Sequence, residues 1–189
     1  MLLALMIFRP GGTLRFWLLG KSSALRTAIG FGLGGVGYAL GTLLLARVLP
    51  PTEFGVFTLF LALVHIGVTL GPVGLEGQVN RRPGGGVSPG RPLLTSLAVA
   101  GATAVVASML YRMNLALIVA LVISITAGGI SRVASAIFQS RLRFGIALSL
   151  SQGIAIMLLG MGTLALIAGG AQLQLLAALV AGYYVISSL

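Results

Sequence analysis

The chain contains no cysteine and no aspartate, and its other metal-binding and acid–base groups are few. Without cysteine it has no disulfide framework, no thiol nucleophile and no cysteine-ligated metal site. Two glutamates, Glu53 and Glu76, and one histidine, His65, are too few for a dinuclear metal centre or a paired-carboxylate acid–base site. We therefore expect a protein that is not an enzyme, with no catalytic residues, no cofactor and no metal.

Charge is also scarce: 7% of the 189 residues are charged, 58% are hydrophobic, and the mean hydropathy is +1.11. A soluble domain carries about 25% charged residues, so we expect lipid to cover most of this surface and membrane lipids to be partners. The net charge of +10 comes from residues at the ends of apolar runs. Because no basic face with interleaved aromatic residues is present, the sequence argues against nucleic-acid binding.

Six apolar runs follow residue 23, and a helix of about 20 apolar residues crosses a bilayer core. We expect an all-α, polytopic membrane helix bundle of about six transmembrane helices over residues 24–189. We expect residues 1–23, which precede the bundle, to be a cytoplasmic or interfacial segment. They do not resemble a signal peptide, because their charge lies after the apolar stretch, whereas a signal peptide carries its charge before it. The last run ends without a polar tail, which predicts truncation at the C-terminus. The predicted spans are 27–46, 54–75, 92–111, 113–134, 146–168 and 173–189.

Basic residues alternate between the gaps that separate these runs. Only Arg47 and Arg112 lie on one side of the predicted membrane, and ten lie on the other. Positive charge accumulates on the cytoplasmic side, so we expect a multi-pass plasma-membrane protein with a cytoplasmic N-terminus. The ten are Arg9, Arg15, Lys21, Arg26, Arg81, Arg82, Arg91, Arg132, Arg141 and Arg143.

Span one carries a stripe of glycines at spacings of 4, 3 and 4: Gly30, Gly34, Gly37 and Gly41. The segment also fits G-x-G-x-x-G, but a dinucleotide site needs a preceding strand and a soluble βαβ unit. The stripe therefore predicts close helix–helix packing. Arg26 continues the stripe one turn earlier, so it either anchors the helix end at the membrane surface or points into the bundle. The positive-inside pattern favours the anchor.

Span two carries its polar groups on one helical face. A charged group inside a membrane costs at least ~2–3 kcal/mol, so this stripe predicts a polar cavity, with packing between helices as the alternative. Gly71, Pro72 and Gly74 should kink or unwind the helix, and broken transporter helices often form binding sites and hinges. The stripe consists of Thr58, Ala62, His65, Thr69, Pro72, Glu76 and Asn80.

Span four has a weaker polar stripe: Ser124, Gly128, Ser131, Ser135 and Gln139. Small residues at this spacing favour helix packing. Arg132, Arg141 and Arg143 follow at the predicted cytoplasmic surface, where we expect them to hold anionic lipid headgroups. Gln152 in span five is expected to be a buried amide that is hydrogen-bonded within the bundle.

Three segments carry a resemblance to a known family. Leu43–Phe57 reads LLLARVLPPTEFGVF, Leu70–Glu76 reads LGPVGLE and leads to Arg81, and Ser135–Gln139 reads SAIFQ. They resemble the first two helices and the fourth-helix exit of bacterial polysaccharide biosynthesis membrane proteins. These are flippases of the multidrug/oligosaccharidyl-lipid/polysaccharide exporter superfamily. The resemblance covers most of residues 24–189, as an N-terminal half only.

The resemblance implies one lobe of a two-lobed transporter fold in the bacterial inner membrane. Such proteins move lipid-pyrophosphate-linked glycans, O-antigen precursors of lipopolysaccharide among them, by alternating access. It implies substrate-binding roles for Arg26, His65, Thr69 and Glu76, and a second lobe or a homodimer partner. The alternatives are a cation-coupled drug exporter of the same superfamily and a non-transporting membrane subunit or scaffold in polysaccharide assembly.

Overall fold

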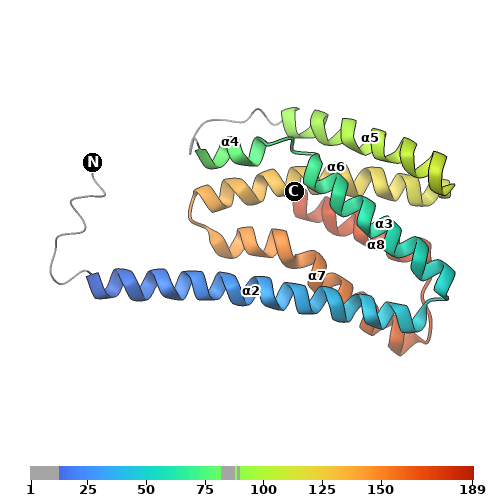
Figure 1. The fold of residues 1–189 in the computed structure, drawn as a ribbon, viewed down its shortest axis with the longest axis horizontal. Helices are drawn as coiled ribbons and strands as arrows, with labels where there is room; N and C mark the ends of the chain where they lie inside the picture. The colour runs from blue at the N-terminus through green and yellow to red at the C-terminus, as the bar shows by residue number, and fades with distance from the viewer. Residues whose placement is uncertain (1–12, 82–87, 89) are drawn as a thin grey trace.

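The computed structural model describes the backbone of residues 13–81, 88 and 90–189, and their side chains from residue 28 onward except that of Asn80. All regular secondary structure in these ranges is helical, which confirms the predicted all-α class (Figure 1). The helices are α2 (Thr13–Val48), α3 (Pro51–Leu70), α4 (Leu75–Arg81), α5 (Gly90–Tyr111), α6 (Leu115–Ser140), α7 (Phe144–Ala168) and α8 (Leu173–Ser188).

Five of these helices, α2, α3, α5, α6 and α7, are long and apolar enough to cross a membrane, and α8 is a shorter apolar helix. Large apolar side chains point outward from the bundle: Ile167 is 79% exposed, Ile156 69% and Leu94 67%. Such a surface suits lipid rather than water. The chain is therefore a helical bundle of the multi-pass membrane class, with five long apolar helices and one shorter one.

The helix boundaries follow local chemistry. Asn114 caps α6, because its side-chain oxygen accepts a hydrogen bond of 2.9 Å from the Leu117 amide. Gly169 ends α7 in the left-handed conformation, with φ of 69°. This turn lies between the predicted spans 146–168 and 173–189. Helix α2 continues through residues 13–23 from Thr13 without a break, and the candidate span within it is Ala28–Val48. The cytoplasmic or interfacial position of the first residues stays a prediction.

The glycine stripe of α2 packs against α7, which confirms the packing interpretation. A Cβ atom added to Gly41 would lie 2.6 Å from the backbone of Leu158 and Leu159. Cβ atoms at Gly30 and Gly34 would overlap the side chains of α7 in the same way. The two helices therefore run together along one side of the bundle (Figure 1), and their backbones are closest at Gly41.

Helix α6 is the centre of the bundle, where it contacts α3, α4, α5, α7 and α8. It is also the most enclosed of the candidate spans, with 56% of the residues in its most apolar stretch buried. Phe57 and Phe60 of α3 and Leu121 and Ile125 of α6 are fully buried in the shared core. This arrangement holds one face of α6 against the end of α3, where the chain leaves helical geometry.

The second predicted span is broken at the residues where the sequence predicts a kink. Helix α3 ends at Leu70 and α4 begins at Leu75. Pro72 has no amide hydrogen to donate to a helical carbonyl. Val73 and Gly74 both have positive φ, 45° and 78°, a conformation that is costly for valine. The chain between the two helices is therefore a strained turn.

Candidate functional site: a polar cavity beside the broken helix

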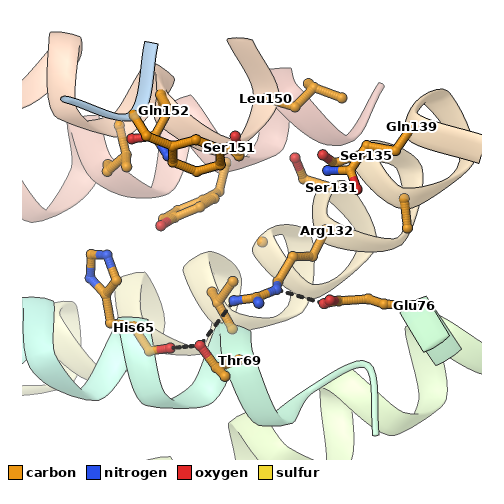
Figure 2. A pocket seen from close by; sticks show the side chains of 16 residues that line it. His65, Thr69, Glu76, Ser131, Arg132, Ser135, Gln139, Leu150, Ser151 and Gln152 are labelled. Atoms are coloured by element: carbon orange, nitrogen blue, oxygen red, sulfur yellow. Dashed lines mark hydrogen bonds and ion pairs between the residues drawn. The ribbon is translucent and has the colours of Figure 1, made fainter. Parts of the chain in front are cut away.

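A cavity of about 340 Å³ lies among α2, α3, α4, α6, α7 and α8, next to the broken helix. This volume falls at the lower end of the range for small-molecule binding sites, ~300–1,000 Å³. Its wall is unusually polar for the interior of a membrane bundle (Figure 2). The polar side chains that line it are His65, Thr69, Glu76, Ser131, Arg132, Ser135, Gln139, Ser151, Gln152 and Tyr184.

Arg132 is the centre of the hydrogen-bond network in this cavity. Its Nε donates to Oε1 of Glu76 at 2.6 Å, and its Nη1 donates to Oγ1 of Thr69 at 3.0 Å. The Thr69 hydroxyl in turn donates to the carbonyl oxygen of His65 at 2.8 Å (Figure 2). Arg132 therefore connects α6 to both helices that flank the break, and its bond to Glu76 is charge-assisted.

His65 lies one turn before Thr69 on the same face of α3. Its Nδ1 is 3.2 Å from the carbonyl oxygen of Leu61, and its ring meets the ring of Tyr38 edge-on, with centroids 5.5 Å apart. Since a carbonyl oxygen only accepts, a hydrogen bond to Leu61 requires the proton on Nδ1. The imidazole of His65 is exposed on the cavity wall, where it can contact a ligand.

The structure brings three of the four predicted substrate-binding residues together, because His65, Thr69 and Glu76 all line the cavity. Their contact with a substrate stays a prediction. The side chain of the fourth, Arg26, lies outside the described residues. The hinge role of Gly71, Pro72 and Gly74 also stays a prediction, although these residues do form the break.

Three other members of the span-two stripe, Thr58, Ala62 and Pro72, do not line the cavity. Thr58 donates to carbonyl oxygens of its own helix, those of Phe54 at 3.0 Å and Gly55 at 2.9 Å. Pro72 is fully buried, on the side of the break that faces Gly129 of α6. Among the described side chains, the predicted stripe therefore faces the cavity only at His65, Thr69 and Glu76.

The span-four stripe packs against neighbouring helices, as predicted, and it also lines the cavity. A Cβ atom at Gly128 would meet Val68 of α3 and Tyr184 of α8, and Ser135 donates to the carbonyl oxygen of Ala147 in α7 at 3.0 Å. The stripe residues on the cavity wall are Gly128, Ser131, Ser135 and Gln139. Gln152 was expected to be hydrogen-bonded in the core, but it lies half-buried against Gly34 and makes no hydrogen bond with any other described residue.

Arg132 is the main cavity residue that the sequence did not reveal, since it was assigned to lipid headgroups. The prediction placed it at the end of a span, whereas α6 continues for two more turns, to Ser140. Its position is also four residues after Gly128 and three before Ser135, which puts it on the polar face of the helix. That spacing is the sequence signal that could have identified it.

The charges of the cavity wall balance. Among the described residues, the cavity wall carries one carboxylate, that of Glu76, and one guanidinium, that of Arg132. Their side chains are 31% and 42% exposed. The described residues contain no group of three or more histidine, aspartate or glutamate side chains that could hold a metal ion. The site therefore has the chemistry of an ion pair surrounded by hydroxyl and amide groups.

No protein-family model, no curated protein and no solved structure matches this chain. The features of this chain that bear on function are the cavity, the broken helix beside it, and the short sequence motifs in Leu43–Phe57 and Leu70–Glu76.

Proposed function

We propose that this protein is a transmembrane flippase that moves a lipid-linked oligosaccharide or polysaccharide precursor across the bacterial inner membrane. The observation that carries the proposal is the Arg132–Glu76 ion pair on the wall of a polar cavity in an otherwise apolar bundle. Ionisable groups inside membrane proteins are costly, and they occur mainly along the path of a polar substrate or ion.

The chemistry of the cavity favours an anionic, hydroxyl-rich ligand. A guanidinium carries five N–H donors and suits the oxygen atoms of phosphate groups. Ser131, Ser151, Gln139 and Gln152 are on the same wall and provide hydroxyl and amide groups for sugar hydroxyls. A diphosphate-linked glycan contains both kinds of group, and its lipid tail can remain in the bilayer outside the bundle.

The dimensions of the cavity support the proposal that this bundle works with another one. A cavity of about 340 Å³ holds a diphosphate and its first sugar more readily than a longer glycan. A second lobe, or a second copy of this chain, would enlarge the enclosure. The resemblance of Leu43–Phe57 to the oligosaccharide flippases supports the same arrangement.

The break in span two supports alternating access, and the exposed arginines support entry of the substrate from the cytoplasmic side. The arginines Arg81, Arg91 and Arg141 are exposed at the end of the bundle that contains α4, the start of α5 and the α6–α7 turn (Figure 1). By the positive-inside rule this end is cytoplasmic, as is the N-terminus. The cavity lies toward this end, so a substrate would enter it from the cytoplasmic side.

A cation-coupled drug exporter of the same superfamily is the second candidate. Glu76 favours it, because a cavity carboxylate can bind a cationic drug or a coupling ion. The charge of Glu76 is already matched by Arg132 at 2.6 Å. That pairing makes an anionic ligand, which can share the arginine, the better fit.

The flippase proposal can be tested by complementation in a bacterial host from which the native flippase has been deleted. Surface polysaccharide should fall about tenfold or more in Arg132→Gln, because a hydrogen bond to a charged group contributes ~1.5–3 kcal/mol. Arg141→Gln removes an exposed arginine outside the cavity wall and should leave polysaccharide unchanged. Full complementation by Arg132→Gln, with equal amounts of protein in the membrane, would contradict the proposal.

A further inference from the structure

We infer that Arg132 is an anion-binding site that the chain's own Glu76 occupies in this structure, and that a phosphate-type oxyanion that displaces Glu76 releases α4. Arg132 thus acts as a clamp on the broken helix, and ligand binding opens it. This inference rests on the proposed function for the source of the anion, a transported diphosphate headgroup. The clamp itself depends only on the geometry of three side chains.

The clamp joins the two sides of the break through one guanidinium. Thr69 is the penultimate residue of α3, and Glu76 is the second residue of α4. Arg132 reaches both from α6, through different nitrogen atoms, at 3.0 Å and 2.6 Å. The side chain of Arg132 therefore fixes the position of α4 relative to α3 while both contacts are in place.

Among the described residues, α4 contacts the bundle mainly through α6. The helix has seven residues, and helices this short are unstable without tertiary contacts. Its buried apolar contacts form a small cluster of Leu75 and Val79 with Val133 and Ala136 of α6. The chain before it is a turn with two residues of positive φ. Loss of the ion pair should therefore loosen α4 while α3, which is anchored in the main core, remains in place.

The contact between Glu76 and Arg132 is one that an oxyanion can replace. It is a single hydrogen bond, from Nε to Oε1, rather than the stronger two-point arrangement that a guanidinium can form. A phosphate group offers several oxygen atoms to the same guanidinium. Both side chains are partly exposed, so a ligand can approach. The displaced carboxylate moves with α4 toward the end of the bundle, where water can solvate it.

The absence of cysteine from the chain makes a direct test possible. Spin labels would be placed on Gln78→Cys in α4 and Ser149→Cys in α7, both exposed positions outside the cavity wall. The distance distribution between the labels would be measured in lipid nanodiscs as inorganic pyrophosphate is added at constant ionic strength. Pyrophosphate should convert a narrow distribution into a broader or shifted one, with a defined midpoint concentration.

Three variants in the labelled background identify the site. Arg132→Gln should show the released distribution without pyrophosphate and no further response to it. Glu76→Gln weakens the side chain that competes with pyrophosphate for Arg132. The midpoint concentration of pyrophosphate should therefore fall roughly tenfold, the effect of replacing a charge-assisted hydrogen bond with a neutral one. Arg141→Gln should behave as the parent does. Because Glu76→Gln is nearly isosteric, it tests the exchange even if Arg132→Gln fails to fold.

Three results would overturn the inference: no response in the parent, a response that persists in Arg132→Gln, or an unchanged midpoint in Glu76→Gln. The proposed function is tested separately by the polysaccharide assay. A protein that shows the exchange but supports no polysaccharide would keep the clamp and reject the flippase. A protein that supports polysaccharide but shows no exchange would reject the clamp alone.

Discussion

The contact between α2 and α7 provides the sharpest test of the packing of this bundle, through the substitution Gly41→Ala. A Cβ atom at Gly41 would lie 2.6 Å from the backbone carbon of Leu158 and the backbone nitrogen of Leu159. Ordinary contacts begin at 3.4 Å, so the new atom is 0.8 Å too close. Because both neighbouring atoms belong to the main chain, a change of side-chain rotamer cannot relieve the overlap, and the two helices must separate.

Gly35→Ala is the matched control, because it lies on the same helix and its Cβ would meet nothing within 4 Å. Both substitutions gain the same helix propensity, about 1 kcal/mol. Only Gly41→Ala incurs the cost of overpacking, ~1–3 kcal/mol. The difference between the two variants should therefore be ~1–3 kcal/mol, which corresponds to roughly 2–12 °C in the unfolding midpoint of a domain of this size.

The assay is thermal unfolding of both variants in the same detergent, followed by circular dichroism at 222 nm. The expected order of unfolding midpoints is Gly35→Ala at or above the parent and Gly41→Ala below both. Equal midpoints for the two variants would refute the close approach of α2 and α7. That result would also remove the support for the glycine stripe as a packing surface.

Two further predictions concern helix ends. Asn114→Ala removes the cap on the Leu117 amide and should lower the free energy of unfolding by about 1 kcal/mol. Gln172→Ala, at an N-cap without a side-chain hydrogen bond, is the control and should leave it unchanged. Equal losses in the same assay would contradict the capping assignment. Gly169→Ala places a side chain at φ of 69° and should destabilise the end of α7 by ~1–2 kcal/mol, and an unchanged midpoint would argue against the left-handed turn.

The helical bundle could be predicted from the sequence because its signals are local. Runs of apolar residues determine which segments can cross a membrane, and Gly169 marks the turn between α7 and α8. The glycine stripe of α2 predicted a packing face for the same reason, since the spacing places Gly34, Gly37 and Gly41 on one side. The identity of the partner helix could not be predicted, because it depends on the tertiary arrangement.

The candidate site was predictable only in part. His65, Thr69 and Glu76 share a face of one predicted helix, so their common position could be inferred from spacing. The contact of Arg132 with Glu76 joins residues 56 positions apart, and it exists because the break after Leu70 turns α4 toward α6. The sequence predicted the break but not its direction. Arg132 was consequently assigned to the membrane surface.

The accessibility of single cysteines to a membrane-impermeant thiol reagent would test the central claim most directly. The claim is that a water-accessible polar cavity lies within a lipid-facing bundle. Gln139→Cys and Ser151→Cys lie on the cavity wall, and Ile156→Cys, at a position that is 69% exposed on α7 and does not line the cavity, is the matched control. Since thiols react as thiolates, they need water to do so.

The account predicts rapid modification of Gln139→Cys and Ser151→Cys, and none of Ile156→Cys. The reaction should be fast in inside-out membrane vesicles and slow in intact cells, because the cavity lies toward the cytoplasmic end. Equal protection of all three cysteines would contradict the cavity. Modification of the two cavity cysteines only from outside the cell would contradict the orientation.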